Sequence, residues 1–257
     1  MGKVKIVILE SISSSSHGNC HLLSNRDTTI MLDCGVLYSK MPSILTKDVK
    51  GVLITHEHSD HVKGLKSLIM NKLTKIYSTK ETLSRLEIKY TSLLKEVIPY
   101  KLFSIGSFMI MPFEIEHDAV NPINYLIKDT ISGAQFLYIT DTGYIDNLTF
   151  EDIDYILIEC NFDEKNYNKE ILTKTEEIKK SRLMSNKGHL SIQKCVQFLR
   201  KTINHNTKKI ILGHISRDNK NYLEFQETVK KECNFKNVIA LNPSLIGSAI
   251  TKLKDIN

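Results

Sequence analysis

Three histidines and one aspartate lie within six residues of one short segment: His56, His58, Asp60 and His61. The segment follows a buried-strand pattern over 51–55, and His56 and His58 are two residues apart, so at a strand end their imidazoles project from the same face. If a helix begins near Asp60, this carboxylate and His61 lie in its first turn and can reach a second ion. Imidazole and carboxylate together suit zinc, manganese or iron. The spacing therefore favours a metal site over a polar loop with a helix N-cap.

Strands and helices must position these side chains. Apolar alternation and β-branched residues predict strands near 3–9, 20–24, 28–33, 49–55, 75–78, 108–116, 123–128, 134–140, 155–160, 208–213 and 237–241. Helical periodicity predicts helices near 40–46, 61–72, 80–88, 164–182, 191–204 and 220–233. This order predicts an α/β fold with mixed sheets flanked by helices. Because the sequence contains neither a repeat nor a linker, we expect a single domain over 1–257.

Composition narrows the chemistry. The five cysteines are scattered and none has Cys-x-x-Cys spacing, so a metal must be held by histidine and aspartate. A net charge of +6 gives slight support for a polyanionic partner. The longest apolar runs are far shorter than the ~20 residues of a membrane-spanning helix, so we expect no membrane segment. The N-terminal residues do not resemble a secretory signal, and we expect a cytoplasmic protein.

The spacing His-x-His-x-Asp-His resembles the signature of the metallo-β-lactamase superfamily. The resemblance implies a four-layered αββα sandwich, with metal ligands on loops at one edge of two facing sheets. It also implies later ligands that each follow a strand, and His117, Asp141 and His214 follow predicted strands in the required order. The family pattern then gives one ion to His56, His58 and His117, the other ion to Asp60, His61 and His214, and both ions to Asp141.

Further segments resemble the cytoplasmic YycJ/WalJ-type subgroup of that superfamily, which is associated with DNA exonuclease activity. The similarity runs over most of the chain and is carried by the segments 13–20, 32–35, 117–125, 138–144, 159–163, 188–191 and 212–219. It implies a cytoplasmic enzyme that acts on DNA and uses no organic cofactor.

Two Gly-His-x-Ser segments, at 188–191 and 213–216, resemble paired motifs of the tRNA 3′-processing endonucleases, which favours phosphodiester chemistry. Two metal ions about 3.5–4 Å apart can generate a bridging hydroxide and neutralise charge on the attacked phosphate. The leading hypothesis is therefore a nuclease with two divalent ions, Zn or Mn, which degrades DNA from a 5′ end. We expect Asp60 to orient the nucleophile in addition to binding metal.

The two motif histidines differ in position. His214 follows the apolar strand 209–213, where the other ligands converge, so we expect it to bind metal. His189 instead precedes the helical stretch 191–204, with Ser191 as a possible N-cap, and we expect it on a loop across the cleft. From there it can contact the scissile phosphate or protonate the leaving oxygen. The alternative is that His189 only orders its loop.

Three other functions stay open. An RNA-processing endonuclease shares the paired motifs, although a long insertion for binding tRNA is not recognisable in the sequence. A small-molecule hydrolase or an iron-dependent thiol dioxygenase uses the same metal motif, but the segment 188–191 argues against both. A non-catalytic DNA-binding protein is disfavoured because all seven ligand positions are retained.

Overall fold

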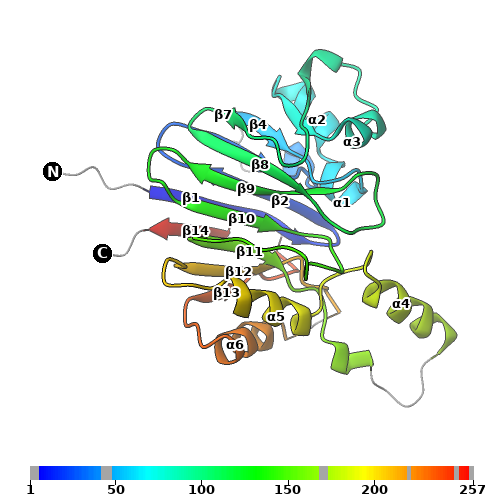
Figure 1. Ribbon diagram of the computed structural model, residues 1–257. Coiled ribbons are helices and arrows are strands. Elements are labelled where there is room, and N and C mark those ends of the chain that lie inside the picture. The colour runs from blue at the N-terminus through cyan, green and yellow to red at the C-terminus, as the bar shows by residue number, and fades with distance from the viewer. Residues whose placement is uncertain (1–5, 42–47, 168–172, 219–220, 246–248, 255–257) are drawn as a thin grey trace.

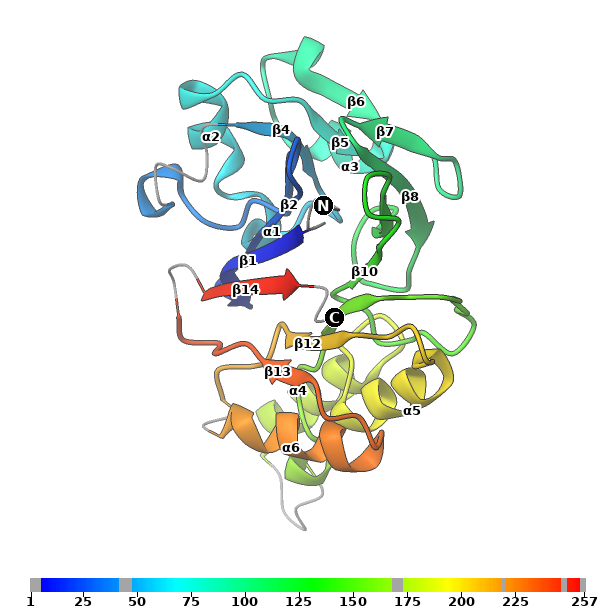
Figure 2. The same cartoon turned by 90° about the vertical axis from the view of Figure 1, so that its left-hand side faces the viewer.

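The computed structural model describes residues 6–41, 48–167, 173–218, 221–245 and 249–254. Two seven-stranded sheets, here called sheet A and sheet B, form the centre of the molecule (Figure 1). Figure 2 shows helix α2 outside sheet A and helices α5 and α6 outside sheet B. The arrangement is the predicted four-layered αββα sandwich.

Sheet A has the spatial order β14-β1-β2-β3-β4-β5-β6. Its strands are antiparallel from β14 to β3 and parallel from β3 to β6. Parallel strands covered on both faces consist of continuous apolar runs, as in the segment Thr-Ile-Met-Leu of β3. The bounds are β1 Ile6–Ser15, β2 Gly18–Ser24, β3 Thr29–Leu32, β4 Val49–Leu53, β5 Ile76–Ser78, β6 Leu94–Glu96 and β14 Ala249–Lys254.

Sheet B has the order β13-β12-β11-β10-β9-β8-β7. Strands β7 to β10 are antiparallel neighbours, and β10 to β13 are parallel. The parallel part therefore directs the carboxyl ends of β10, β11 and β12 to the same edge. The bounds are β7 Phe103–Ile105, β8 Phe108–Glu114, β9 Ile123–Asp129, β10 Gln135–Ile139, β11 Tyr155–Glu159, β12 Lys209–Gly213 and β13 Val238–Ala240.

Three apolar cores hold the four layers together. Strand β11 illustrates the alternation, because Tyr155 and Leu157 pack between the sheets while Ile156 and Ile158 pack towards the helices on sheet B. The third core joins sheet A to α2 and α3. Each fully buried large apolar side chain stabilises the fold by roughly 1.5–3 kcal/mol relative to its exposed state.

Six α-helices and three short 3₁₀ helices are found in the described residues. Hydroxyl N-caps begin three of the α-helices: Thr79 for α3, Thr173 for α4 and Ser191 for α5. In the part of the chain that is described, no helix combines the length and the apolar character needed to cross a bilayer. The helices are α1 Ser59–Val62, α2 Leu65–Asn71, α3 Lys80–Arg85, α4 Lys174–Met184, α5 Ile192–Thr202, α6 Tyr222–Glu232, η1 Tyr38–Lys40, η2 Thr91–Leu93 and η3 Glu164–Tyr167.

The predicted elements differ from the observed ones at identifiable places. Strand β1 continues through the serines as far as Ser15, where the strand was expected to end near residue 9. The predicted helix 61–72 is two helices separated at Gly64. The Gly64 amide donates to the carbonyl of Cys34 instead of to a helix carbonyl, and a Cβ on Gly64 would lie 1.9 Å from the carbonyl oxygen of Val36. The predicted helix 40–46 lies almost wholly outside the described residues.

Candidate metal centre

The predicted ligands follow the carboxyl ends of strands from both sheets. His56 and His58 follow β4 of sheet A. From sheet B, His117 follows β8, Asp141 follows β10 and His214 follows β12. The two remaining residues, Asp60 and His61, lie in the single turn of α1. The sheets therefore bring together residues that are up to 158 positions apart, as the numbering of His56 and His214 shows.

Three imidazoles converge in a first group. His56 Nε2 lies 3.0 Å from His58 Nδ1, and His117 Nε2 lies 3.3 Å from the same His58 atom. Burial lowers the pKa of both His56 and His117 below the ordinary value, so these rings are neutral near pH 7 and have lone pairs to offer. This is the set of residues that was predicted for one ion, and its ring nitrogens lie within 4.8 Å of one another.

A second group combines carboxylate and imidazole. Asp60, His61 and His214 have donor atoms within 4.8 Å of one another, as do His56, His61 and Asp141. His61 Nε2 is 2.8 Å from Asp141 Oδ2 and 3.5 Å from Asp60 Oδ2. Asp141 therefore lies between the two groups, in the position expected of a bridging ligand.

Buried acceptors orient three of the histidines. His61 Nδ1 is 2.9 Å from the carboxylate of Asp33, and His117 Nδ1 is 3.2 Å from the carbonyl oxygen of Gly188. His214 Nδ1 is 3.0 Å from Glu159 Oε1. With an acceptor beside Nδ1 in each ring, Nε2 is the nitrogen available to bind a metal. His214 Nε2 is buried and has no hydrogen-bond partner among the described residues. The site thus fits a divalent metal, which would supply the missing partner.

Asp33 is a functional residue that sequence reasoning missed. Its carboxylate is fully buried and accepts hydrogen bonds from Thr55 N, from Thr55 Oγ1 at 3.0 Å and from Tyr138 Oη at 2.7 Å. These contacts fix the carboxylate against His61. A buried carboxylate is stable only when it is paired in this way, so an aspartate directly after an apolar strand was the signal available in the sequence.

Glu159 is a second missed residue. It is the last residue of β11, after four apolar residues, and it holds two histidines, because its Oε1 lies 2.7 Å from His189 Nδ1 and 3.0 Å from His214 Nδ1. Its Oε2 accepts backbone N–H groups from Thr142 and Leu190. One carboxylate thereby fixes a predicted metal ligand and a predicted catalytic residue relative to each other.

The backbone is strained at the positions that turn these side chains inwards. Asp33, Asp141 and His214 have positive φ angles of 55°, 48° and 47°. Each follows a strand, and the left-handed conformation redirects the chain within one residue. Such conformations cost of order 1–3 kcal/mol each in a residue other than glycine, and they concentrate at functional sites.

A polar pocket of about 280 Å³ opens onto these groups. His189 and Arg182 line it together with predicted ligands from both groups, and the His189 side chain is 25% exposed. The carboxylate of Asp118 stands at the rim, 3.1 Å from Arg182 Nη2 and 4.0 Å from His58 Nε2. The pocket therefore presents metal-ligating groups, one histidine outside the predicted ligand set and one cation to a single bound molecule.

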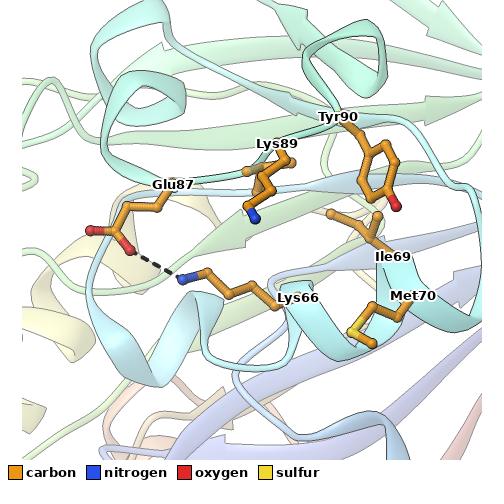
Figure 3. Close-up of a pocket in the computed structure, with 7 residues that line it drawn as sticks. Lys66, Ile69, Met70, Glu87, Lys89 and Tyr90 are labelled. Carbon is orange, nitrogen blue, oxygen red and sulfur yellow. Dashed lines mark hydrogen bonds and ion pairs between the residues drawn. The ribbon is translucent and has the colours of Figure 1, made fainter.

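A larger hollow, of about 360 Å³, lies between α2 and the segment 87–90 (Figure 3). Ile69, Met70 and Tyr90 form its apolar wall, and Lys66 is paired with Glu87 across it, as the dashed line in Figure 3 shows. It shares no lining residue with the metal pocket. With a single carboxylate and no histidine in its lining, it does not resemble a catalytic site.

Comparison with known proteins agrees with this geometry. A family model described as "Beta-lactamase superfamily domain" matches residues 28–215, well over half of the 257 residues. The chain belongs to the metallo-β-lactamase superfamily. A protein named Exodeoxyribonuclease WalJ, from Streptococcus pneumoniae, is 33% identical over 226 residues that cover 81% of each chain. Exodeoxyribonuclease YycJ from Bacillus anthracis is 26% identical over 223 residues.

Two solved structures share the fold, and the first is described as a metallo-β-lactamase fold protein. YhfI from Bacillus subtilis aligns with a TM-score of 0.70 at 16% identity and covers 95% of this chain and 99% of its own. A diphosphatase from the PhnP family aligns with a TM-score of 0.64 at 13% identity and covers 98% of this chain and 100% of its own. The predictions of the superfamily, its WalJ/YycJ-type subgroup and the sandwich fold are confirmed. The ligand assignment and the single domain over 1–257 stay predictions.

Proposed function

We propose that this metallo-β-lactamase superfamily member is a metal-dependent exodeoxyribonuclease that hydrolyses phosphodiester bonds. One observation carries the proposal: His189, held by Glu159, lines the same pocket as both groups of metal-ligating side chains. A pocket that only bound metal would have no use for an additional oriented histidine. The relatives named as exodeoxyribonucleases support DNA as the substrate.

We assign one metal ion to His56, His58 and His117, a second to Asp60, His61 and His214, and both to Asp141. When bound, such ions activate water and neutralise charge on the attacked phosphate. Imidazole and carboxylate ligands suit zinc or manganese.

Two side chains then carry out proton transfer and orientation. The Asp60 carboxylate is 20% exposed in the pocket and can accept a hydrogen bond from the attacking water. His189 has Nδ1 bound to Glu159, so Nε2 is the nitrogen available to the leaving oxygen. Burial alone would lower the pKa of His189, but the neighbouring Glu159 outweighs burial and raises it. The raised pKa favours a protonated ring, which can donate to the leaving oxygen.

Metal content is expected to reach two ions per chain at about pH 8 and to fall as the solution is acidified. Burial would lower the pKa of His214, but Asp141, Asp60 and Glu159 outweigh burial and raise it in the metal-free protein. A proton must therefore leave when a metal binds, and affinity rises with pH. Quantitative metal analysis after dialysis checks the count, and Asp141→Ala should lose both ions. One ion or fewer after saturation would contradict the two-metal assignment.

Digestion of labelled nucleic acids tests the function. We expect metal-replete protein to shorten DNA stepwise from an end. This activity should be lost in excess chelator, because the bound ions are proposed to activate the attacking water. DNA labelled at the 5′ or the 3′ terminus reports the polarity, for which a 5′ start stays a prediction. RNA of the same sequence serves as the parallel substrate.

Three outcomes would contradict the proposal. Cleavage of RNA at internal sites in preference to DNA would support the RNA-processing alternative. If the protein cleaves neither DNA nor RNA but hydrolyses lactones or thioesters, it is a small-molecule hydrolase. Nucleic-acid binding without cleavage in saturating metal would indicate a non-catalytic protein.

A further inference from the structure

Helix α4 differs from the other long helices because it has no buried residue. Helices α5 and α6 each bury an apolar face against sheet B, whereas Ile178 of α4 is 64% exposed. A helix without an apolar face gains little from the core of its own chain. Its N-terminus is instead stabilised locally, by a capping box between Thr173 and Glu176. Figure 1 shows α4 standing away from the sheets, on the same side of the molecule as α1.

The helix and the turn after it are strongly basic. Between 174 and 187 the chain has five cationic side chains and two carboxylates. Two of the cations pair with acids outside the helix, Lys179 with Asp218 and Arg182 with Asp118. The Arg182 side chain is 76% exposed, and exposed pairs of this kind add little stability, so a stronger anion can displace them. The five cations are Lys174, Lys179, Lys180, Arg182 and Lys187.

The carboxyl end of α4 is fixed to the metal centre. The amide of His189 donates to the carbonyl of Leu183, which folds the turn back onto the helix. A Cβ on Gly188 would lie 2.3 Å from the carbonyl oxygen of Arg182. A Cβ on Gly143, in the turn after Asp141, would lie 2.1 Å from the carbonyl oxygen of Ser185. The helix end is thus joined to His189 and packed against the turn after Asp141, which places Arg182 beside the pocket.

We propose that α4 binds the sugar-phosphate backbone of the DNA strand next to the bond that is cleaved. Arg182 both lines the pocket and belongs to α4, so it can pair with the first phosphate beyond the scissile one, leaving Asp118. Lys187 and the lysines of the helix add positive charge to the same segment, 174–187. Such contacts position a strand without reading its sequence. The proposal rests on the nuclease function and names the surface that holds its substrate.

Binding of single-stranded DNA to metal-free protein tests this proposal without turnover. A fluorescent oligonucleotide is titrated in chelator at several salt concentrations, and anisotropy gives the affinity. The double variant Arg182→Gln/Lys187→Gln is expected to bind more weakly, and the slope of log affinity against log salt should fall by about 1.4, since each phosphate contact on a single strand contributes about 0.7. The matched control Lys231→Gln/Lys236→Gln removes the same charge from exposed positions in and after α6 and should keep the wild-type slope.

A third variant is expected to change DNA affinity in the opposite direction. Asp118→Asn releases Arg182 from its ion pair and removes a negative charge from the rim, so it should tighten DNA binding. Circular dichroism in the same chelator, together with metal content measured before chelation, shows whether each variant is folded. An unchanged slope in the α4 variant, or an equal loss in the control, would overturn the role of α4. So would equally tight binding of poly-glutamate, which would indicate an acidic protein partner. Failure of the wild-type protein to cleave DNA would instead overturn the nuclease function, which separates the two failures.

Discussion

Substitution of Asp60 by asparagine is expected to lower the rate of DNA hydrolysis by about 10²–10⁴-fold, the usual contribution of an acid or base positioned at the reacting group. Burial opposes ionisation of Asp60, but interactions with His214 and His61 outweigh burial and hold its pKa below the ordinary value. The carboxylate is therefore negative at every working pH. Asparagine keeps the shape of the side chain, but it loses the charge and one of the two acceptor oxygens.

Initial rates at saturating metal, together with circular dichroism, measure this effect. The fold should be preserved because Asp60 lies in the single turn of α1 and contributes no buried apolar surface. Asp27→Asn, at an exposed position outside the pocket, is the matched control and should keep the wild-type rate. An Asp60→Asn enzyme with more than about a tenth of the wild-type rate would show that the carboxylate has neither predicted role.

The variants His189→Ala and His214→Ala are expected to lose activity for different reasons. His189→Ala should keep the metal and lose about 10²–10⁴-fold in turnover, because the ring is proposed to protonate the leaving oxygen. His214→Ala should lose metal at the second position, because its buried Nε2 is the atom that faces Asp60, at 3.7 Å from Oδ2. Both rings share Glu159, so the two substitutions separate ligation from proton transfer within one hydrogen-bonded unit.

Metal content and turnover must be measured on the same samples. The rate-against-pH profile adds a test, since removal of a proton donor should abolish the decline of rate at high pH. His205→Ala, at an exposed position in the loop before β12, controls for the loss of an imidazole. Loss of metal from the His189 variant, or undiminished turnover, would return His189 to the role of ordering its loop.

Much of the fold could be predicted from the sequence because its signals are local. The alternation of apolar residues located β8 to β12 to within about two residues. Strands β6 and β7 were missed because they are short and weakly apolar: β6 is Leu-Lys-Glu and β7 is Phe-Ser-Ile, whereas the equally short β13, Val-Ile-Ala, is wholly apolar. Strand β14 was missed because its pairing with β1 depends on contact between segments far apart in the chain. The break at Gly64 likewise depends on the backbone of Cys34, which accepts the Gly64 amide and which no local pattern reveals.

The candidate site divides in the same way. The motif from His56 to His61 is local, so its residue types and spacing alone indicate a metal site. His117, Asp141 and His214 could be predicted as metal ligands only because the family pattern places each ligand directly after a strand. Asp33 and Glu159 orient imidazoles that follow other strands, His61 and His214 respectively. The sequence shows these two acids but does not show which histidines they contact.

The left-handed backbone conformation of the site residues sets thermal stability against activity. At Asp141 and His214 glycine would relieve the backbone, yet it would remove the side chains on which the site depends. Selection for backbone stability alone at these two positions would therefore favour inactive variants. Library design on this scaffold should hold both positions constant and look for added robustness elsewhere, for example on the exposed faces of α6.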